Sequence, residues 1–279
     1  PVGPVALIVP WNFPLLIACW KLAPALACGN PVVLKPASLT PLTALLLGDV
    51  LVDAGVPADQ VHVLPGPGGV IGDALVSDPR TAKISFTGET TTGASILKAS
   101  ADHIARVSLE LGGKSAAIVF ADADVEAAAA DLPMSVFGNA GQDCCARSRI
   151  LVERPVYDRF LEAFSARTDA IVVGDPLDPG TEMGPLISAA QRQVALDYLE
   201  IGTGEGARLV QGGQVPDGDG FYLAPAVVAD VHNSMRIARE EIFGPVASIL
   251  PFDGEDEAIT VSNDSDYGLS GALWTGSAP

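Results

Sequence analysis

The feature that most constrains the fold is a regular alternation of short apolar runs with longer helical patterns over residues 1–112. The apolar runs predict strands at Val5–Val9, Val32–Leu34, Val61–Leu64, Ile84–Phe86 and Val107–Leu111. The helical patterns between them predict helices at Leu15–Ala27, Leu42–Ala54, Val70–Ser77 and Thr91–Ala101. One helix between successive strands is typical of a parallel, doubly wound α/β sheet, and apolar strands fit a sheet that is buried on both faces.

The pattern of alternating strands and helices changes after Gly112. We therefore expect a domain boundary between residues 1–112 and residues 113–279. In the second part, Asp124 is a plausible N-cap for an alanine-rich helix that starts at about Val125. Further strands are predicted at Ser115–Phe120, Arg149–Val152, Arg208–Val210 and Val246–Phe252, and helices at Val156–Thr168, Ala189–Ile201 and Glu255–Asn263. The stretches 174–185 and 212–220 are rich in Pro, Gly and Asp and predict loops.

Charge and composition exclude several classes of protein. The chain has 16 basic and 34 acidic side chains and a formal net charge of −18, so we expect neither a nucleic-acid partner nor an anionic membrane surface. Residues 1–20 carry no charge, but four prolines interrupt them, which argues against a membrane span. Pro1 is the first residue and Met134 the first methionine, so we expect a fragment that lacks both ends.

The cysteines and histidines indicate neither a disulfide framework nor a metal site. The four cysteines include no CxxC pair, which favours a reduced, cytoplasmic setting. The three histidines are scattered along the chain, so no metal ligand set is expected from their spacing.

Three positions have side chains that could take part in catalysis, and each also has a non-catalytic interpretation. Cys144 lies in a Gly/Asn-rich turn and could be a nucleophile, although a buried, inert cysteine is commoner. Glu110 ends a predicted strand, where burial would raise the pKa of a general base toward neutral; a solvated carboxylate is the alternative. The Asn12 amide could donate to an oxyanion or be a simple turn residue.

Two glycine-rich turns and a lysine indicate binding of phosphate or ribose. The stretches 65–72 and 86–93 offer backbone amides before helical patterns, and Lys35 lies at another strand end. Neither turn matches G-x-G-x-x-G after the first strand, so each is weak alone.

Taken together, these segments resemble the aldehyde dehydrogenase superfamily, whose members depend on NAD(P) and a cysteine nucleophile. The segments that carry the resemblance are Pro10–Pro14, Leu22–Pro36, Phe86–Gly88, Leu109–Lys114, Gly141–Cys144 and Glu240–Val246. The resemblance runs through essentially all 279 residues. It implies part of a Rossmann-like cofactor-binding domain in residues 1–112 and an incomplete α/β catalytic domain in residues 113–279.

The resemblance also implies a mechanism of aldehyde oxidation to a carboxylic acid. Cys144 would form a thiohemiacetal and then a thioester, and Asn12 and the Cys144 backbone N–H would stabilise the oxyanion. Glu110 would activate water, and Lys21 would support proton transfer. The implied contacts of NAD or NADP are Ile8, Pro10, Trp11, Lys35, Ser38, Gly68, Gly72, Phe86, Gly88, Glu89, Leu111, Glu241 and Phe243. An aldehyde substrate, a homo-oligomer and no metal complete the expectation.

Three residues depart from the family pattern. Ser38 stands where the family often has a Glu that repels a 2′-phosphate, so NADP should be tolerated beside NAD. Glu89 replaces a common Ser and puts a carboxylate where a pyrophosphate is expected, unless it caps the following helix. Asp143 would raise the pKa of Cys144 unless it points at substrate, which favours cationic or amino aldehydes.

Three other functions stay open at this point. A CoA-acylating semialdehyde dehydrogenase would pass the acyl group to a thiol, although Glu110 argues for hydrolysis. A cysteine hydrolase that needs no nicotinamide would usually require a histidine partner, and no histidine lies in a motif. The third alternative is an inactive fragment.

Overall fold

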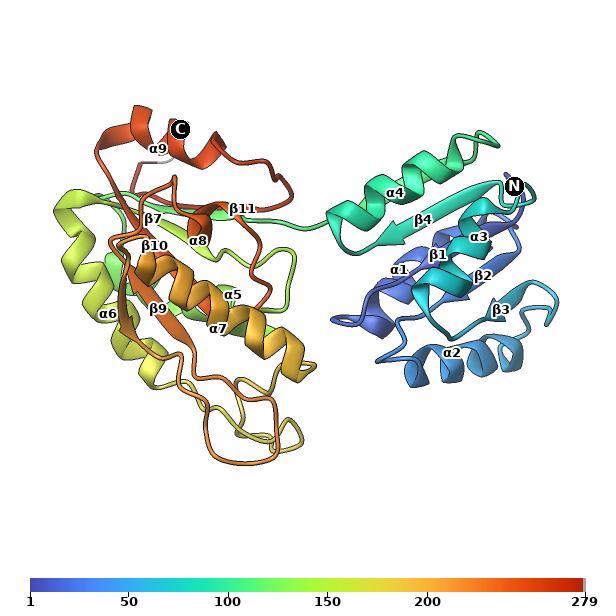
Figure 1. Cartoon of the computed structure of the whole chain (residues 1–279), viewed down its shortest axis with the longest axis horizontal. Helices are drawn as coiled ribbons and strands as arrows, with labels where there is room; N and C mark the ends of the chain where they lie inside the picture. The colour runs from blue at the N-terminus through green and yellow to red at the C-terminus, as the bar shows by residue number, and fades with distance from the viewer. Residues whose placement is uncertain (278–279) are drawn as a thin grey trace. The chain divides into compact units, whose positions relative to one another are not determined.

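The computed structural model describes residues 1–277, and the chain divides into two compact units, Pro1–Gly112 and Gly113–Pro279 (Figure 1). Each unit contains its own sheet, and each is described separately below. Within residues 1–277, no helix is long and apolar enough to cross a membrane.

The first unit contains a five-stranded parallel sheet with the spatial order β3-β2-β1-β4-β5. Its strands are β1 (Val5–Ile8), β2 (Val32–Lys35), β3 (Val61–Val63), β4 (Lys83–Thr87) and β5 (Arg106–Glu110). The strand order reverses between β1 and β4. In doubly wound sheets, ligands bind beyond the carboxyl ends of the strands at such a reversal.

Helices cover both faces of this sheet. They are α1 (Pro14–Ala27), α2 (Leu42–Asp53), α3 (Asp73–Ser77) and α4 (Thr90–Ser100). Alternate residues of β1 enter different cores: Val5 and Leu7 pack with apolar residues of α1 and α2, and Ala6 and Ile8 pack with those of α3 and α4. The prediction of a doubly wound sheet with a strand buried on both faces is therefore confirmed at β1.

Two details of this unit differ from the prediction. The helix expected at Val70–Ser77 begins with a π-helical turn, η1 (Gly68–Gly72), which leads into α3. Strand β5 lies at the edge of the described sheet, and its residues are exposed or half-buried rather than buried. An edge strand has a neighbour on one side only, so its apolar sequence does not by itself ensure burial.

The second unit contains a six-stranded sheet with the order β11-β6-β7-β10-β9-β8. Its strands are β6 (Ala116–Val119), β7 (Arg149–Glu153), β8 (Arg208–Gln211), β9 (Ala226–Ala229), β10 (Val246–Phe252) and β11 (Gly271–Trp274). All neighbours are parallel except β8, which runs antiparallel to β9. Strands β9 and β11 were missing from the sequence prediction.

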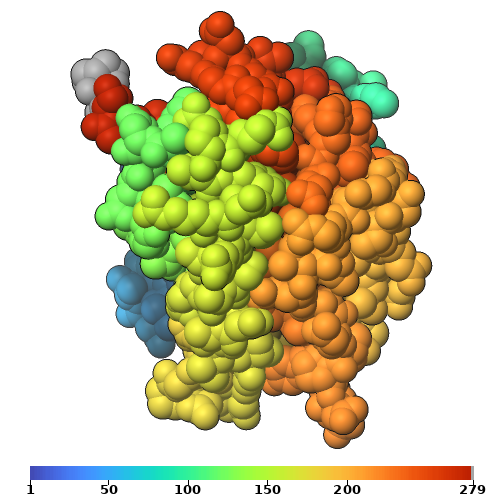
Figure 2. All heavy atoms as spheres, turned by 90° about the vertical axis from the view of Figure 1, so that its left-hand side faces the viewer, coloured from blue at the N-terminus to red at the C-terminus, as the bar shows by residue number. Residues whose placement is uncertain are grey.

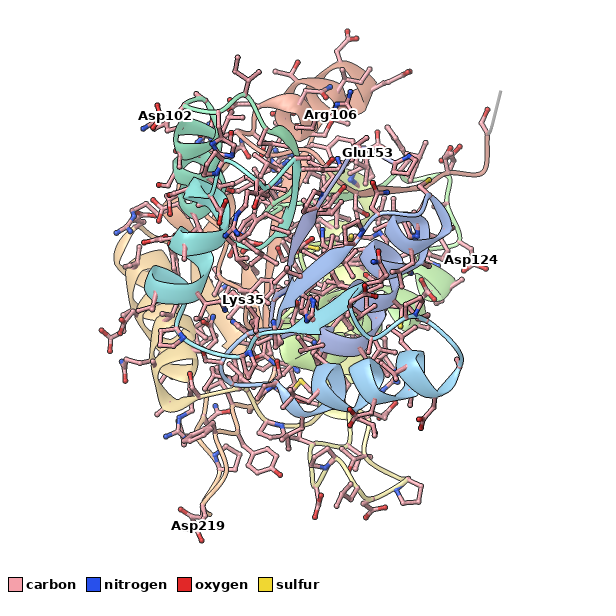
Figure 3. All side chains as sticks on the ribbon, turned by 90° about the vertical axis from the view of Figure 1, so that its right-hand side faces the viewer. Lys35, Asp102, Arg106, Asp124, Glu153 and Asp219 are labelled. Atoms are coloured by element: carbon pink, nitrogen blue, oxygen red, sulfur yellow. The ribbon has the colours of Figure 1, made fainter. Side chains whose placement is uncertain are left out.

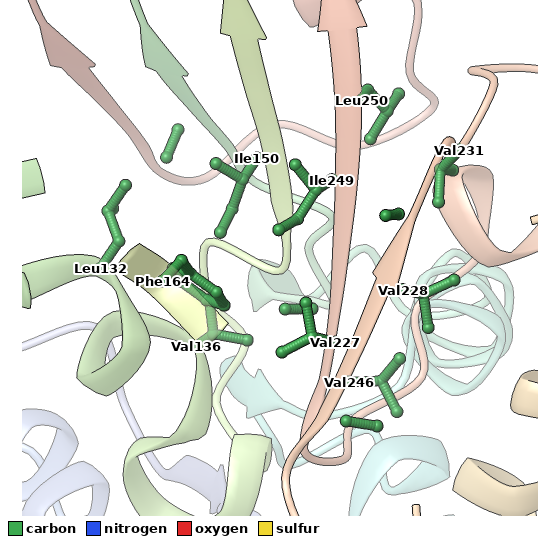
Figure 4. Close-up of a cluster of buried hydrophobic side chains, with 14 of the residues drawn as sticks. Leu132, Val136, Ile150, Phe164, Val227, Val228, Val231, Val246, Ile249 and Leu250 are labelled. Atoms are coloured by element: carbon green, nitrogen blue, oxygen red, sulfur yellow. The ribbon is translucent and has the colours of Figure 1, made fainter. Parts of the chain in front are cut away.

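The helices of this unit enclose one large core. They are α5 (Val125–Phe137), α6 (Tyr157–Asp169), α7 (Ala189–Gly204), α8 (Arg236–Arg239) and α9 (Gly254–Asn263), with short 3₁₀ turns η2 (Gly138–Gly141) and η3 (Arg154–Val156). Buried side chains from α5, α6, β7, β9 and β10 meet in this core (Figure 4). The predicted N-cap is confirmed, since the Asp124 carboxylate accepts from the Ala127 N–H at 3.0 Å.

Two loops project from one end of the second unit. They contain the stretches 174–185 and 212–220, and both extend at the bottom of Figures 1 and 2. The sequence predicted both as loops from their Pro, Gly and Asp content. Within the first stretch, Met183 is buried in the core of this unit.

Candidate active site

A cavity of about 470 Å³ opens beyond the carboxyl ends of β1, β2 and β4 in the first unit. Most residues predicted to contact a nicotinamide cofactor line it, namely Ile8, Pro10, Trp11, Lys35, Ser38, Gly68, Gly72, Phe86, Gly88 and Glu89. Leu111 does not line this cavity; it packs half-buried against the core of α3 and α4. The cavity lies at the reversal of strand order, where a doubly wound sheet binds its ligand.

Lys35 is the buried cation of this cavity. The residue, which Figure 3 labels, is only 5% exposed. Its Nζ donates to the Pro36 carbonyl at 2.9 Å. Burial lowers the pKa of Lys35. Ser38 lies three residues after Lys35, and its side chain is small and uncharged. It is exposed, and its hydroxyl donates to the Gly66 carbonyl at 3.0 Å.

Two glycines and a glutamate also line the cavity. A Cβ at Gly68 or Gly72 would meet no atom within 4 Å, so the backbone borders open space at both positions. Glu89 is the N-cap residue of α4, but its side chain makes no capping bond to a backbone N–H; it accepts from the Thr92 hydroxyl at 3.4 Å. The carboxylate therefore stands at the cavity without the cap expected of it.

Lys21 and Glu110 interact electrostatically in the same unit. Lys21 Nζ donates to Ser85 Oγ at 2.9 Å, and burial lowers the pKa of Lys21 to about 8, although the charge of Glu110 opposes this shift. Glu110 is the last residue of β5 and is exposed. The burial expected for this carboxylate is thus not provided by the first unit.

Asn12 lies in the turn between β1 and α1 and is half-buried. Strands β1 and β5 are parallel and are separated in the sheet by β4. Asn12, which follows β1, and Glu110, which ends β5, therefore lie at the same carboxyl edge of the sheet. The first unit therefore carries three of the four predicted catalytic positions.

The second unit holds Cys144 in the loop that follows α5 and η2. Asn139, Ala140 and Gly141 all have left-handed φ angles, of 52°, 55° and 70°. The Gln142 side chain donates to the Asn139 carbonyl at 3.0 Å and accepts from the Ile187 N–H at 2.9 Å. A Cβ at Gly141 would overlap the Gly244 carbonyl, so only glycine fits this turn.

The surroundings of Cys144 disfavour its thiolate. Burial raises the pKa of the Cys144 thiol, and Cys145, Asp143 and Glu241 raise it further. The effect expected of Asp143 thus has the anticipated direction, but burial and Cys145 contribute more. Both cysteines are half-buried.

Glu241 and Phe243 lie in the segment after α8. Glu241 Oε1 accepts from the Gly113 N–H at 3.1 Å. Gln191 on α7 donates to the carbonyls of Ile242 and Phe243 at 3.1 and 2.9 Å. A Cβ at Gly113 would overlap the Cys144 carbonyl oxygen, so this glycine is in contact with both Glu241 and the cysteine loop.

Sequence reasoning missed two buried cations, Lys114 and Arg149, each 2% exposed. Burial lowers the pKa of Lys114 to about 7; Arg149 adds to the shift, and Glu241 and Glu240 oppose it. Arg149 donates to the Val261 and Ser262 carbonyls at 3.0 and 2.8 Å. The motif at 109–114 contains Lys114, but nothing in its spacing predicts that the ammonium is buried.

Comparison with known proteins agrees with this architecture. The model of the aldehyde dehydrogenase family matches residues 1–278. The chain is 45% identical over 278 residues to a betaine aldehyde dehydrogenase of Rhizobium johnstonii and 48% identical over 275 residues to a geranial dehydrogenase of Castellaniella defragrans. In both cases 99% of this chain is covered, but only 57% of the relative.

Solved structures show the same fold. A Mycobacterium tuberculosis aldehyde dehydrogenase complexed with NAD⁺ superposes with a TM-score of 0.97 at 46% identity, covering 99% of this chain and 58% of that one. An indole-3-acetaldehyde dehydrogenase complexed with NAD⁺ gives 0.98 at 46% identity, covering 99% of this chain and 57% of the other. The chain belongs to the aldehyde dehydrogenase family, and it spans a little over half the length of these relatives.

Proposed function

We propose that the protein oxidises an aldehyde to a carboxylic acid with NAD or NADP as the hydride acceptor. The observation that carries the proposal is the cavity at the β1/β4 reversal, lined by residues that the family motifs assign to cofactor binding. The first unit would be the cofactor-binding part and the second unit the catalytic part. A cytoplasmic location and a homo-oligomeric assembly belong to the same proposal.

The residues of the cavity fit a nicotinamide dinucleotide. Lys35 offers a buried ammonium to the adenosine ribose, and the open backbone at Gly68 and Gly72 allows close approach of a phosphate. In the second unit, Glu241 and Phe243 would contact the nicotinamide ribose and ring. When bound, NAD(P)⁺ accepts the hydride that leaves the substrate carbon. With Ser38, the cavity would bind both cofactors. The serine hydroxyl does not repel a 2′-phosphate, and it does not bind a 2′-hydroxyl as a carboxylate does.

Cys144 is the proposed nucleophile. Its thiolate would attack the aldehyde carbon to give a thiohemiacetal, and the Asn12 amide and the Cys144 backbone N–H would donate to the oxyanion. Each such donor contributes about 10²–10³ in rate. The shifted pKa of the thiol means that its proton must be removed before attack.

Glu110 would then activate the water that hydrolyses the thioester. An exposed carboxylate in reach of solvent can take a proton from water, and the lowered pKa of Lys21 makes this ammonium a proton donor near neutral pH. Lys21 would support this proton transfer without touching the substrate, because its Nζ donates a hydrogen bond to Ser85.

We further propose a preference for cationic or amino aldehydes. The half-buried Asp143 carboxylate precedes the nucleophile and would attract a positive group on the substrate. One relative is named for betaine aldehyde, which is cationic. Another is named for geranial, which is not, so the preference is expected to be mild.

The test is a panel of aldehydes with each cofactor, on protein expressed from its complete reading frame. Absorbance of the reduced nicotinamide and chromatography of the product are followed, with and without CoA. We expect reduction of either cofactor and a free acid. Acyl-CoA as the main product would indicate the acylating branch, and ester cleavage without cofactor reduction would indicate a hydrolase.

A further inference from the structure

We propose that Asp143, Cys144 and Cys145 form a binding site for a single soft divalent cation, such as Zn²⁺ or Cd²⁺. The two Sγ atoms and a carboxylate oxygen of Asp143 all lie within 4.8 Å of one another. Three donors from three successive residues thus converge on one point of the second unit. No metal was expected from the sequence, because the histidines are scattered and the cysteines include no CxxC pair.

The donor set selects the kind of ion. Thiolates are soft ligands that favour Zn²⁺ and heavier ions of its group such as Cd²⁺, whereas Mg²⁺ and Ca²⁺ are coordinated by oxygen ligands. Zn–S bonds of about 2.3 Å in a tetrahedron place two sulfurs about 3.8 Å apart. The donor atoms therefore need only small side-chain rotations to reach coordinating positions, and water can complete the shell.

The loop holds these donors in place. Gln142, the residue before Asp143, is fixed by its bonds to Asn139 and Ile187. Asp143 Oδ1 accepts from the Cys145 N–H at 2.9 Å, which keeps the carboxylate beside the cysteine pair. Because all three residues are half-buried, an ion can reach them from solvent and is partly shielded once bound.

The charge around the site favours a cation. The carboxylates of Asp143 and Glu241 and the Cys145 thiol all disfavour a negative charge on Cys144. When both thiols bind one ion, two protons leave to the buffer and the divalent charge compensates the two thiolates. No oxidant or reductant takes part.

Binding would have a consequence for the chemistry proposed above. If Cys144 is the nucleophile, a bound cation occupies its sulfur and inhibits the enzyme. This consequence rests on the proposed function, but the ion site itself does not. The two ideas can therefore fail separately.

The experiment uses a C19S/C28S background, in which Cys144 and Cys145 are the only thiols. Reduced protein is titrated with Cd²⁺ under inert gas, and the ultraviolet cadmium–thiolate charge-transfer band reports binding. We expect one Cd²⁺ per chain, no competition from Mg²⁺, and at least about tenfold weaker binding with a reduced band in Cys145→Ser. The chain with Cys144→Ser and Cys145→Ser together should give no band.

A second measurement needs no substitution. Zn²⁺ should slow alkylation of the peptide that contains Cys144 and Cys145, and EDTA should restore the rate, whereas alkylation of Cys28 should not change. Absence of the cadmium band at saturation, or a cysteine-pair variant that binds Cd²⁺ as well as its parent, would overturn the site. If the protein binds Cd²⁺ tightly but oxidises no aldehyde, the result would support the ion site and contradict the proposed function.

Discussion

The backbone N–H of Gly113 donates to Glu241 Oε1 at 3.1 Å and joins two segments that are 128 residues apart in the chain. The same glycine touches the Cys144 carbonyl oxygen so closely that a Cβ could not be inserted. Gly113 therefore connects the proposed nucleophile loop to the glutamate proposed for the nicotinamide ribose. Small changes at this position should be transmitted to both.

Gly113→Ala should displace the Cys144 loop and reduce kcat by about tenfold or more, because a misplaced nucleophile loses its aligned attack. The matched control is Gly138→Ala, at the end of α5, where φ is −50° and a Cβ would meet nothing within 4 Å. Steady-state kinetics and thermal unfolding of both variants measure the difference. Equal activity in the two variants would contradict the contact.

Cys144→Ala should reduce aldehyde oxidation by about 10³-fold or more, since the proposed route is covalent. Cofactor binding, followed by fluorescence quenching, should be retained. Cys145→Ala serves as the control and should keep most of the activity, because it removes only the neighbouring thiol. The reverse pattern would move the nucleophile to Cys145.

Ser38→Glu should abolish use of NADP and leave NAD turnover nearly unchanged. A carboxylate at the exposed cavity position repels a 2′-phosphate and can bind a 2′-hydroxyl. The measurement is kcat/KM with each cofactor, and Ser38→Gln provides a control of similar size without charge. Failure of the parent protein to reduce NADP at saturation would contradict the proposed role of Ser38.

Asp143→Asn should lower kcat/KM for aminobutyraldehyde relative to hexanal by about two- to fivefold, the size expected for a partly exposed charge pair. Kinetics with both aldehydes in parent and variant measure the ratio. An unchanged ratio would show that the carboxylate does not face the substrate.

Lys114 should make stability depend on pH. Its pKa is about 7 in the folded chain, against 10.5 for an ordinary lysine, so between these pH values the unfolded chain binds a proton that the folded chain lacks. Stability should therefore rise with pH across this window, and Lys114→Met should flatten the rise. Urea unfolding of both proteins at several pH values between 7 and 10 measures the slope difference; parallel curves would contradict the burial of this ammonium.

Much of the first unit could be predicted because its strands are apolar runs between turn residues. In the second unit, β9 and β11 were missed. Their residues, Ala-Val-Val-Ala and Gly-Ala-Leu-Trp, are too short and too rich in small side chains to indicate a strand alone. Their strand conformation comes from pairing: β9 lies between β8 and β10, and β11 pairs with β6, which comes much earlier in the chain.

The sequence by itself determined the family and the class of the first sheet and suggested which side chains react, because these depend on residue types in short segments. Only the tertiary structure decided that Lys35 and Lys114 are buried, that Glu110 is exposed and that Gly113 bonds to Glu241. Burial, and with it the pKa of each group, depends on which distant segments pack together. No local pattern carries that information.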